Sequence, residues 1–196
     1  MKKLFVGVLC VALSLSVQGK EVNMTSPDGK YQFTLSDSGG QLHYSLTWNG
    51  KQTVKPSLLG INANVEWRDG VEIGTVDSSR KDTIWHPVYG ERSEIKDCYH
   101  AWKIVVNRQN GRDKLILDVR AYDEGIAFRY HFPGGQYLKI TDEYTEYTMP
   151  EGTKAYFTPK AQTPYSYLPL ENWPGESDRP LLLTLADGGY VCLAEA

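Results

Sequence analysis

The chain has 196 residues, 41% of them hydrophobic, and a formal net charge of −3 at pH 7. This length suits one domain with a hydrophobic core of its own. The sequence has no basic run of the kind that binds nucleic acid, and its small acidic excess favours solubility without indicating a partner.

The first 19 residues have the pattern of a signal peptide. A positively charged start precedes an apolar stretch over residues 4–17, and Val17-Gln18-Gly19 offers small residues at the −3 and −1 positions. We therefore predict cleavage before Lys20 and a secreted or periplasmic protein. The apolar stretch is too short to predict a membrane span. A lipid anchor on Cys10 is the alternative, which the bulky residue before this cysteine disfavours.

Residues 20–196 alternate between apolar and polar side chains almost throughout, which is typical of β-strands. The alternation is clear over residues 31–35 and 42–48. Further strands are expected at residues 104–106, 115–121 and 126–132. Turn signals rich in glycine, proline and asparagine separate these runs, and no segment has the 3.6-residue period of a helix. We predict one all-β domain over residues 20–196, built as an antiparallel sandwich.

Two stretches lack this regularity. Residues 75–100 mix polar and aromatic side chains, and residues 159–180 contain five prolines and three aromatic residues. A long proline-rich loop in a compact domain is usually functional or covers another part of the protein. The alternative for this loop is a plain connection over the surface.

Residues 181–196 predict a β-hairpin with its turn at Ala186-Asp187-Gly188-Gly189. In the returning strand, Val191 and Leu193 share one face with Glu195. A carboxylate on an apolar row is unfavourable unless a cation, a donor or water satisfies it, so Glu195 is a candidate functional residue. The sequence stops one residue later without a turn or a capping residue, and we therefore expect this domain to belong to a longer protein.

The sequence contains no visible catalytic motif. It has no nucleophile elbow, no phosphate-binding glycine-rich loop and no histidine-rich zinc motif, and its four scattered histidines are expected to be structural. Cys98 and Cys192 either pair in an oxidising compartment or remain buried free thiols, and we favour the thiols. Arg120 and Arg129 flank a predicted turn, where we expect a structural charge cluster with a carboxylate such as Asp118.

Aromatic residues are numerous enough to form a surface on which sugar rings stack, with five tryptophans and 13 tyrosines. Trp48 and Trp102 lie in predicted strands and are expected in the core. Trp85 and Trp173 lie in the two irregular stretches, which makes them the better candidates for binding a sugar.

Short pieces spread over residues 20–196 carry a further indication. They are Ser26-Pro27-Asp28-Gly29-Lys30, Pro56-Ser57-Leu58-Leu59-Gly60, Trp85-His86-Pro87-Val88-Tyr89-Gly90-Glu91, Glu94-Ile95-Lys96-Asp97, Ala121-Tyr122-Asp123-Glu124-Gly125-Ile126-Ala127-Phe128-Arg129-Tyr130 and Tyr190-Val191-Cys192-Leu193-Ala194-Glu195-Ala196. The third and fifth pieces together are the most specific. In this order, the pieces resemble the N-terminal domain of glycoside hydrolase family 97.

The resemblance implies an antiparallel β-super-sandwich of the galactose-mutarotase-like type. In the family this domain precedes a (β/α)8 barrel, which supplies the general acid and its partner. Members are secreted or periplasmic, exo-acting α-glucosidases or α-galactosidases with a calcium ion in the active site. The N-terminal domain walls that site and contributes one calcium-ligating glutamate from a motif that ends in Glu-Ala. Glu195 matches this glutamate, and oxygen ligands are those that calcium prefers.

The chain departs from the family pattern in two ways. Ala194 stands where the family often has histidine or serine, and the barrel with its catalytic carboxylates is missing. We therefore expect this chain alone to lack catalytic residues and to bind calcium weakly or not at all. The expected partners are the catalytic barrel and α-linked glucosides or galactosides. The alternatives are a stand-alone carbohydrate-binding β-sandwich that stacks sugars on Trp85 and Trp173, and a structural module without a site.

Overall fold

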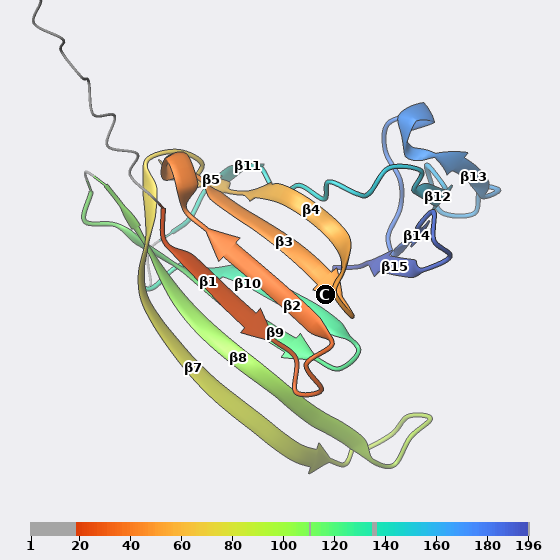
Figure 1. Cartoon of the computed structure of the whole chain (residues 1–196), viewed down its shortest axis with the longest axis horizontal. Helices are drawn as coiled ribbons and strands as arrows, with labels where there is room; N and C mark the ends of the chain where they lie inside the picture. Colours follow the sequence, from red (N-terminus) through yellow and green to blue (C-terminus); the bar gives the residue numbers. More distant parts are fainter. Residues whose placement is uncertain (1–18, 110, 135–136, 196) are drawn as a thin grey trace, which may run out of the picture.

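The computed structural model describes residues 19–109, 111–134 and 137–195, and it is built almost entirely from β-strands (Figure 1). The predicted leader falls, except for Gly19, outside the described residues. Two four-stranded antiparallel sheets form the body of the molecule. The first contains, in spatial order, β1 (Glu21–Thr25), β2 (Tyr31–Ser36), β3 (Leu42–Trp48) and β4 (Lys51–Leu59). The second contains β10 (Gly125–His131), β9 (Lys114–Tyr122), β8 (Ile95–Arg108) and β7 (Val71–Trp85).

Two smaller sheets complete the fold. A three-stranded sheet contains β11 (Ile140–Glu143), β5 (Ile61–Ala63) and β6 (Val65–Glu66). A four-stranded sheet contains β13 (Ser166–Pro169), β12 (Lys154–Phe157), β14 (Leu181–Thr184) and β15 (Tyr190–Leu193). The only helical turns in the described parts of the chain are two short 3-10 segments, η1 (Ser38–Gly40) and η2 (Leu170–Asn172). None of the described helices is long and apolar enough to cross a membrane.

The hydrophobic core lies between the two large sheets, as the alternating pattern predicts. Phe33 of β2 and Tyr44 of β3 are almost fully buried, and their rings stack with centroids 5.3 Å apart. Phe128 of β10 meets the Tyr44 ring at 5.7 Å, so aromatic side chains join the two sheets. Trp67 is the largest fully buried side chain in the core. Trp48, by contrast, was expected in the core and is 41% exposed, because it ends β3 beside the Asn49-Gly50 turn.

The segment after β11 lies along the outer side of β4. Backbone hydrogen bonds join Tyr144 to Gly60 at 2.8 Å, Glu146 to Leu58 at 2.9 Å, and Lys55 to Thr148 at 2.7 Å. The Tyr44 hydroxyl donates a further bond to the Glu146 carbonyl oxygen at 2.7 Å. Residues 144–148 are therefore fixed to the sandwich before the chain continues to the small sheet of β12–β15.

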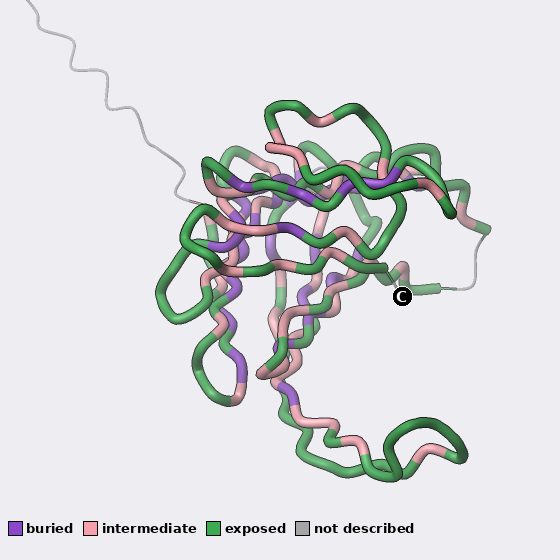
Figure 2. The backbone as a smooth tube through the Cα atoms, turned by 90° about the vertical axis from the view of Figure 1, so that its right-hand side faces the viewer, coloured by how far each residue is buried: buried purple, intermediate pink, exposed green. Residues whose placement is uncertain are grey.

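Residues 75–100 form an extended arm, where the sequence predicted an irregular stretch. β7 and β8 pair without interruption from Val76↔Ile104 to Trp85↔Ile95, and the arm projects beyond the other strands (Figure 1). Beyond Val76 most of β7 is exposed, and Figure 2 shows the arm as the mostly green tube that curves away at the bottom of the molecule. A strand with both faces exposed to water needs no alternation of apolar and polar side chains. The sequence pattern therefore does not reveal this strand.

The hairpin predicted at residues 181–196 is present as β14 and β15. Leu181 pairs with Leu193 and Thr184 with Tyr190, and Gly188 takes the positive φ of 88° that the tight turn requires. Lys51, at the start of β4, forms an ion pair of 3.1 Å with Asp187 in this turn. The hairpin is thereby connected to the body of the molecule at one end and to β12 along β14.

Candidate functional site

Glu195 lies just beyond the last strand, where the sequence placed its candidate functional residue. If the β14–β15 register continues for two residues, Glu195 falls opposite Arg179, and the two side chains form an ion pair. Both side chains are more than half exposed. The apolar row that precedes Glu195 is present as well, because Val191 and Leu193 are less exposed than Tyr190 and Cys192.

The arginine supplies the cation that a carboxylate on an apolar row needs. An exposed ion pair of this kind contributes only about 0–1 kcal/mol to stability, so the pair orients the carboxylate more than it stabilises the fold. The segment that carries Arg179 is itself anchored, because the backbone N–H of Asp178 donates to the Thr158 carbonyl oxygen at 2.8 Å. Glu195 is therefore an accessible, oriented carboxylate at the end of a fixed hairpin.

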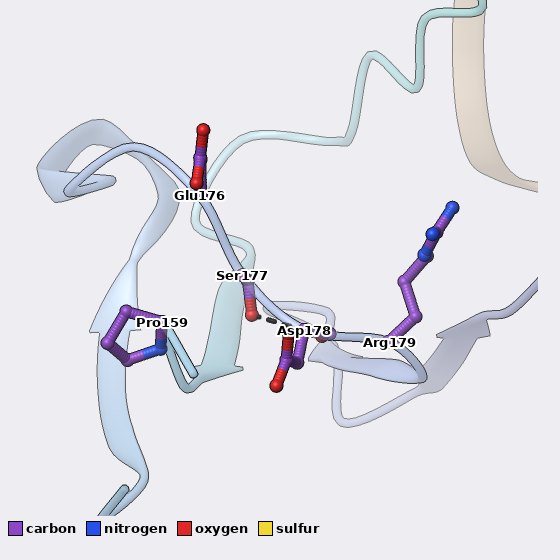
Figure 3. A pocket seen from close by; sticks show the side chains of 5 residues that line it. All are labelled: Pro159, Glu176, Ser177, Asp178 and Arg179. Atoms are coloured by element: carbon purple, nitrogen blue, oxygen red, sulfur yellow. Dashed lines mark hydrogen bonds between the residues drawn. The ribbon is translucent and has the colours of Figure 1, made fainter. Parts of the chain in front are cut away.

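A shallow pocket of about 430 Å³ lies next to this ion pair. Its lining residues are Pro159, Glu176, Ser177, Asp178 and Arg179 (Figure 3). Figure 3 shows the carboxylates of Glu176 and Asp178 pointing in different directions. Within the described residues no three His, Cys, Asp or Glu side chains come together as metal ligands. The described part of the chain thus offers single carboxylates here and no complete metal site.

Trp85, the first of the two candidate sugar-binding residues, ends β7 at the tip of the arm and is 50% exposed. Three further large apolar side chains at this tip, Ile84, Val88 and Tyr89, are even more exposed. Sequence reasoning did not single them out, although Val88 and Tyr89 belong to one of the family-like pieces. We call residues 84–89 the arm tip.

Trp173, the second candidate, lies in a different part of the molecule. It directly follows η2, and its indole N–H donates to the Gly175 carbonyl oxygen. Its ring and that of Phe157 pack in a T-shaped arrangement with centroids 5.3 Å apart. In Figure 1 the small sheet lies at the upper right and the arm tip at the lower right, well apart from each other. The structure therefore does not bring Trp85 and Trp173 together as one stacking surface. Trp102 packs against the core, as expected.

Several other titratable residues that the sequence singled out make structural contacts. His86 hydrogen-bonds the Ser93 carbonyl oxygen at 3.0 Å, and His100 that of Thr25 at 2.9 Å. Asp118 pairs with Arg129 at 3.0 Å, as the expected charge cluster requires. Arg120 is directed elsewhere, because its guanidinium lies over the Tyr99 ring, 4.6 Å from the centroid.

Cys98 and Cys192 are both free thiols. The expectation that both are buried is wrong for Cys192, which is exposed on the outer face of β15. Cys98 is partly buried on β8, and desolvation raises the pKa of its thiol. A raised pKa reduces the thiolate fraction at neutral pH, which gives this residue little nucleophilic character.

Comparison with known proteins gives a consistent result. The family model described as glycosyl-hydrolase 97 N-terminal matches residues 24–196. A curated relative, the retaining alpha-galactosidase of Bacteroides thetaiotaomicron, is 30% identical over 159 residues. The match covers 79% of this chain and 23% of the relative, so the chain spans less than a quarter of the relative's length.

Solved structures with the same fold belong to larger enzymes. A glycoside hydrolase family 97 enzyme from Pseudoalteromonas sp. strain K8, solved in complex with panose, has a TM-score of 0.80 and 22% identity, with 86% of this chain and 27% of that chain covered. The same enzyme has also been solved with acarbose. A beta-arabinopyranosidase has a TM-score of 0.78 and 21% identity, with 87% of this chain and 31% of that chain covered.

Proposed function

Because the chain belongs to the glycosyl-hydrolase 97 N-terminal family, we propose that it is the N-terminal domain of an exported, exo-acting α-glycosidase and supplies Glu195 to the active site. The single observation that carries the proposal is the placement of this carboxylate. It is exposed, oriented by Arg179 and held at the end of a hairpin that is anchored to the rest of the domain. The domain's other roles are to pack against a catalytic barrel and to wall the substrate pocket.

Calcium is the metal that we propose for Glu195. A carboxylate is a hard oxygen ligand, and calcium takes six to eight such ligands. The described residues bring one exposed carboxylate to this point and no cluster, so the fit is that of one ligand within a shared site. When bound, the ion would polarise the departing glycosidic oxygen or orient the general acid. This chain's part is to position the Glu195 carboxylate and to keep Arg179 as its partner before calcium binds.

We propose α-linked glucosides or galactosides as the substrate class. The curated relative's name includes alpha-galactosidase, and the enzyme from Pseudoalteromonas was solved with panose and with acarbose. The pocket beside Arg179 is lined by two carboxylates, Glu176 and Asp178, which point in different directions, so we assign both catalytic groups to the barrel.

The substitution Glu195→Gln in the longer enzyme tests the proposal. It removes the charge and keeps the size of the side chain, while Glu176→Gln serves as the matched control on the neighbouring segment. Loss of an outer-shell partner alone weakens metal binding about 10–100-fold, so loss of a direct ligand should weaken calcium binding at least as much. Calcium titration and kcat/KM measured with aryl α-glycosides give the two readouts. Unchanged calcium affinity and turnover in Glu195→Gln would refute the assignment.

A stand-alone carbohydrate-binding module is the second candidate, favoured by the half-exposed Trp85 ring at the arm tip. This candidate predicts that residues 20–196 bind maltose or melibiose by themselves. Calorimetry of the chain and of its Trp85→Ala and Trp173→Ala variants decides the matter. Binding by the chain that either substitution abolishes would favour the module over the hydrolase domain.

A further inference from the structure

Asp37 is a buried carboxylate whose hydrogen-bond partners are backbone nitrogens. Its Oδ2 accepts from the N–H of Ile73 at 2.7 Å, and its Oδ1 accepts from the backbone nitrogen of Lys20 at 2.5 Å. The residue as a whole is only 9% exposed. In return, the Asp37 N–H donates to the Lys20 carbonyl oxygen at 3.2 Å, which extends the β1–β2 pairing by one step beyond Glu21↔Ser36.

The charge of this carboxylate has no cationic partner in the described structure. None of the ion pairs formed by the described side chains involves Asp37. The Lys20 side chain is not the cationic partner of Asp37, because its Nζ donates to the Gly74 carbonyl oxygen instead. A buried anion without a counter-charge is costly, whereas a charged donor on the same oxygen makes a shorter and stronger hydrogen bond.

Gly19 occupies a position that excludes a side chain. A Cβ at this residue would lie 2.7 Å from the Ser38 Cα and 2.8 Å from Oδ1 of Asp37, closer than carbon atoms approach in proteins. A glycine is also the kind of small residue that leader peptidases accept before the cleaved bond. The same bond that carries the sequence signal for cleavage thus lies against the buried carboxylate.

We propose that the leader is removed between Gly19 and Lys20 and that the new N-terminal ammonium of Lys20 forms a buried ion pair with Asp37. Hydrolysis adds one water to the Gly19–Lys20 amide, leaving a carboxylate on Gly19 and an ammonium on Lys20. Processing therefore converts a neutral amide donor into a charged one at the position where the carboxylate lacks a cation. The exported domain is more stable than the same domain with residue 19 still attached.

A four-protein comparison tests the inference. One chain is exported and processed, with its N-terminus read by intact mass, and the other is made in the cytosol so that it begins at Gly19 and keeps the Lys20 nitrogen as an amide. Each is made with Asp37 and with Asp37→Asn, and Asp69→Asn is the control for loss of an exposed carboxylate. Contacting groups couple by about 0.5–3 kcal/mol. Asp37→Asn should therefore raise the unfolding equilibrium constant about tenfold more in the processed chain, which begins at Lys20 (the Lys20 start), than in the chain that begins at Gly19 (the Gly19 start).

Each outcome of this comparison decides for or against the ion pair. Equal effects of Asp37→Asn in the two starts overturn it, and so does an exported N-terminus at a residue other than Lys20. If Asp37→Asn prevents folding in both backgrounds, the two wild-type chains still decide. A higher urea midpoint for the Lys20 start supports the ion pair, and equal midpoints refute it.

Discussion

Replacing Tyr44 with phenylalanine tests how the segment of residues 144–148 is attached to the sandwich. The Tyr44 side chain is almost fully buried, and its hydroxyl donates to the Glu146 carbonyl oxygen at 2.7 Å. Phenylalanine keeps the contacts with the Phe33 and Phe128 rings but leaves the Glu146 carbonyl oxygen, in a partly buried position, without that donor. Losing a hydrogen bond of this kind costs about 0.5–1.5 kcal/mol, which for a domain of this size lowers the melting temperature by a few degrees.

Tyr31→Phe is the matched control for this substitution. The Tyr31 hydroxyl also donates to a backbone oxygen, that of Glu124, but at 3.4 Å and near the surface. Water can replace such a bond, so the control should change the free energy of unfolding by less than about 0.5 kcal/mol. Urea denaturation of the four chains, including the double variant, gives the values. Equal losses for Tyr44→Phe and Tyr31→Phe would show that burial of the hydroxyl does not govern its contribution.

The pH dependence gives an independent check on Tyr44. Desolvation raises the pKa of its phenol above the ordinary value, as burial does for Tyr130. The folded state then holds the proton more tightly than the unfolded state, so this contribution is complete below about pH 10 and is lost as the pH rises further. Tyr44→Phe should flatten the fall in stability above pH 10. Hydrogen exchange at the amides of residues 144 and 146 should rise in the same variant.

Three further predictions follow from single side chains. Trp67→Ala should cost about 3–5 kcal/mol in urea denaturation, because Trp67 is the largest fully buried side chain, and a loss below 1 kcal/mol would contradict its place in the core. Hydrogen bonds from Lys30 and Ser26 hold the pKa of Asp28 well below its usual range, so its contribution is present above about pH 4 and is lost as the pH falls through the lower folded-state pKa. Asp28→Asn should therefore reduce the slope of stability against pH between 4 and 2, and an unchanged slope would argue against these bonds. Trp85→Ala should leave the melting temperature within about 2 °C of the parent, since its half-exposed ring lies at the end of β7 that projects away from the core.

Much of the sandwich could be predicted from the sequence because burial on one face produces an alternating pattern. The pattern of β3 gives the bounds Leu42–Trp48 directly, and the hairpin of β14 and β15 follows from two apolar runs around a glycine turn. The same reasoning misses the arm, where pairing depends on backbone hydrogen bonds and most side chains are in water. Alternation also assigned Trp48 to the core, although pattern alone does not say where the opposing sheet ends.

The candidate site was only partly predictable. Alternation within β15 predicts that Glu195 continues the row of Val191 and Leu193, but its partner Arg179 depends on strand register and was not foreseen. The two tryptophans chosen for their irregular surroundings lie in unconnected elements, one exposed and one packed on Phe157. Composition identifies residue types that bind sugars, whereas a binding surface requires that they share one face.

The covering of β4 also affects how the chain behaves at high concentration. β4 ends its sheet, and an open edge would offer unpaired N–H and C=O groups to a second molecule. Residues 144–148 occupy that edge with backbone hydrogen bonds. The other long edge strand, β7, has no covering segment of this kind in the described part of the chain. Its exposed part carries the charged residues Arg80, Lys81 and Asp82, which disfavour pairing with a second molecule. Loosening residues 144–148 would therefore expose an aggregation-prone edge before the core itself unfolds.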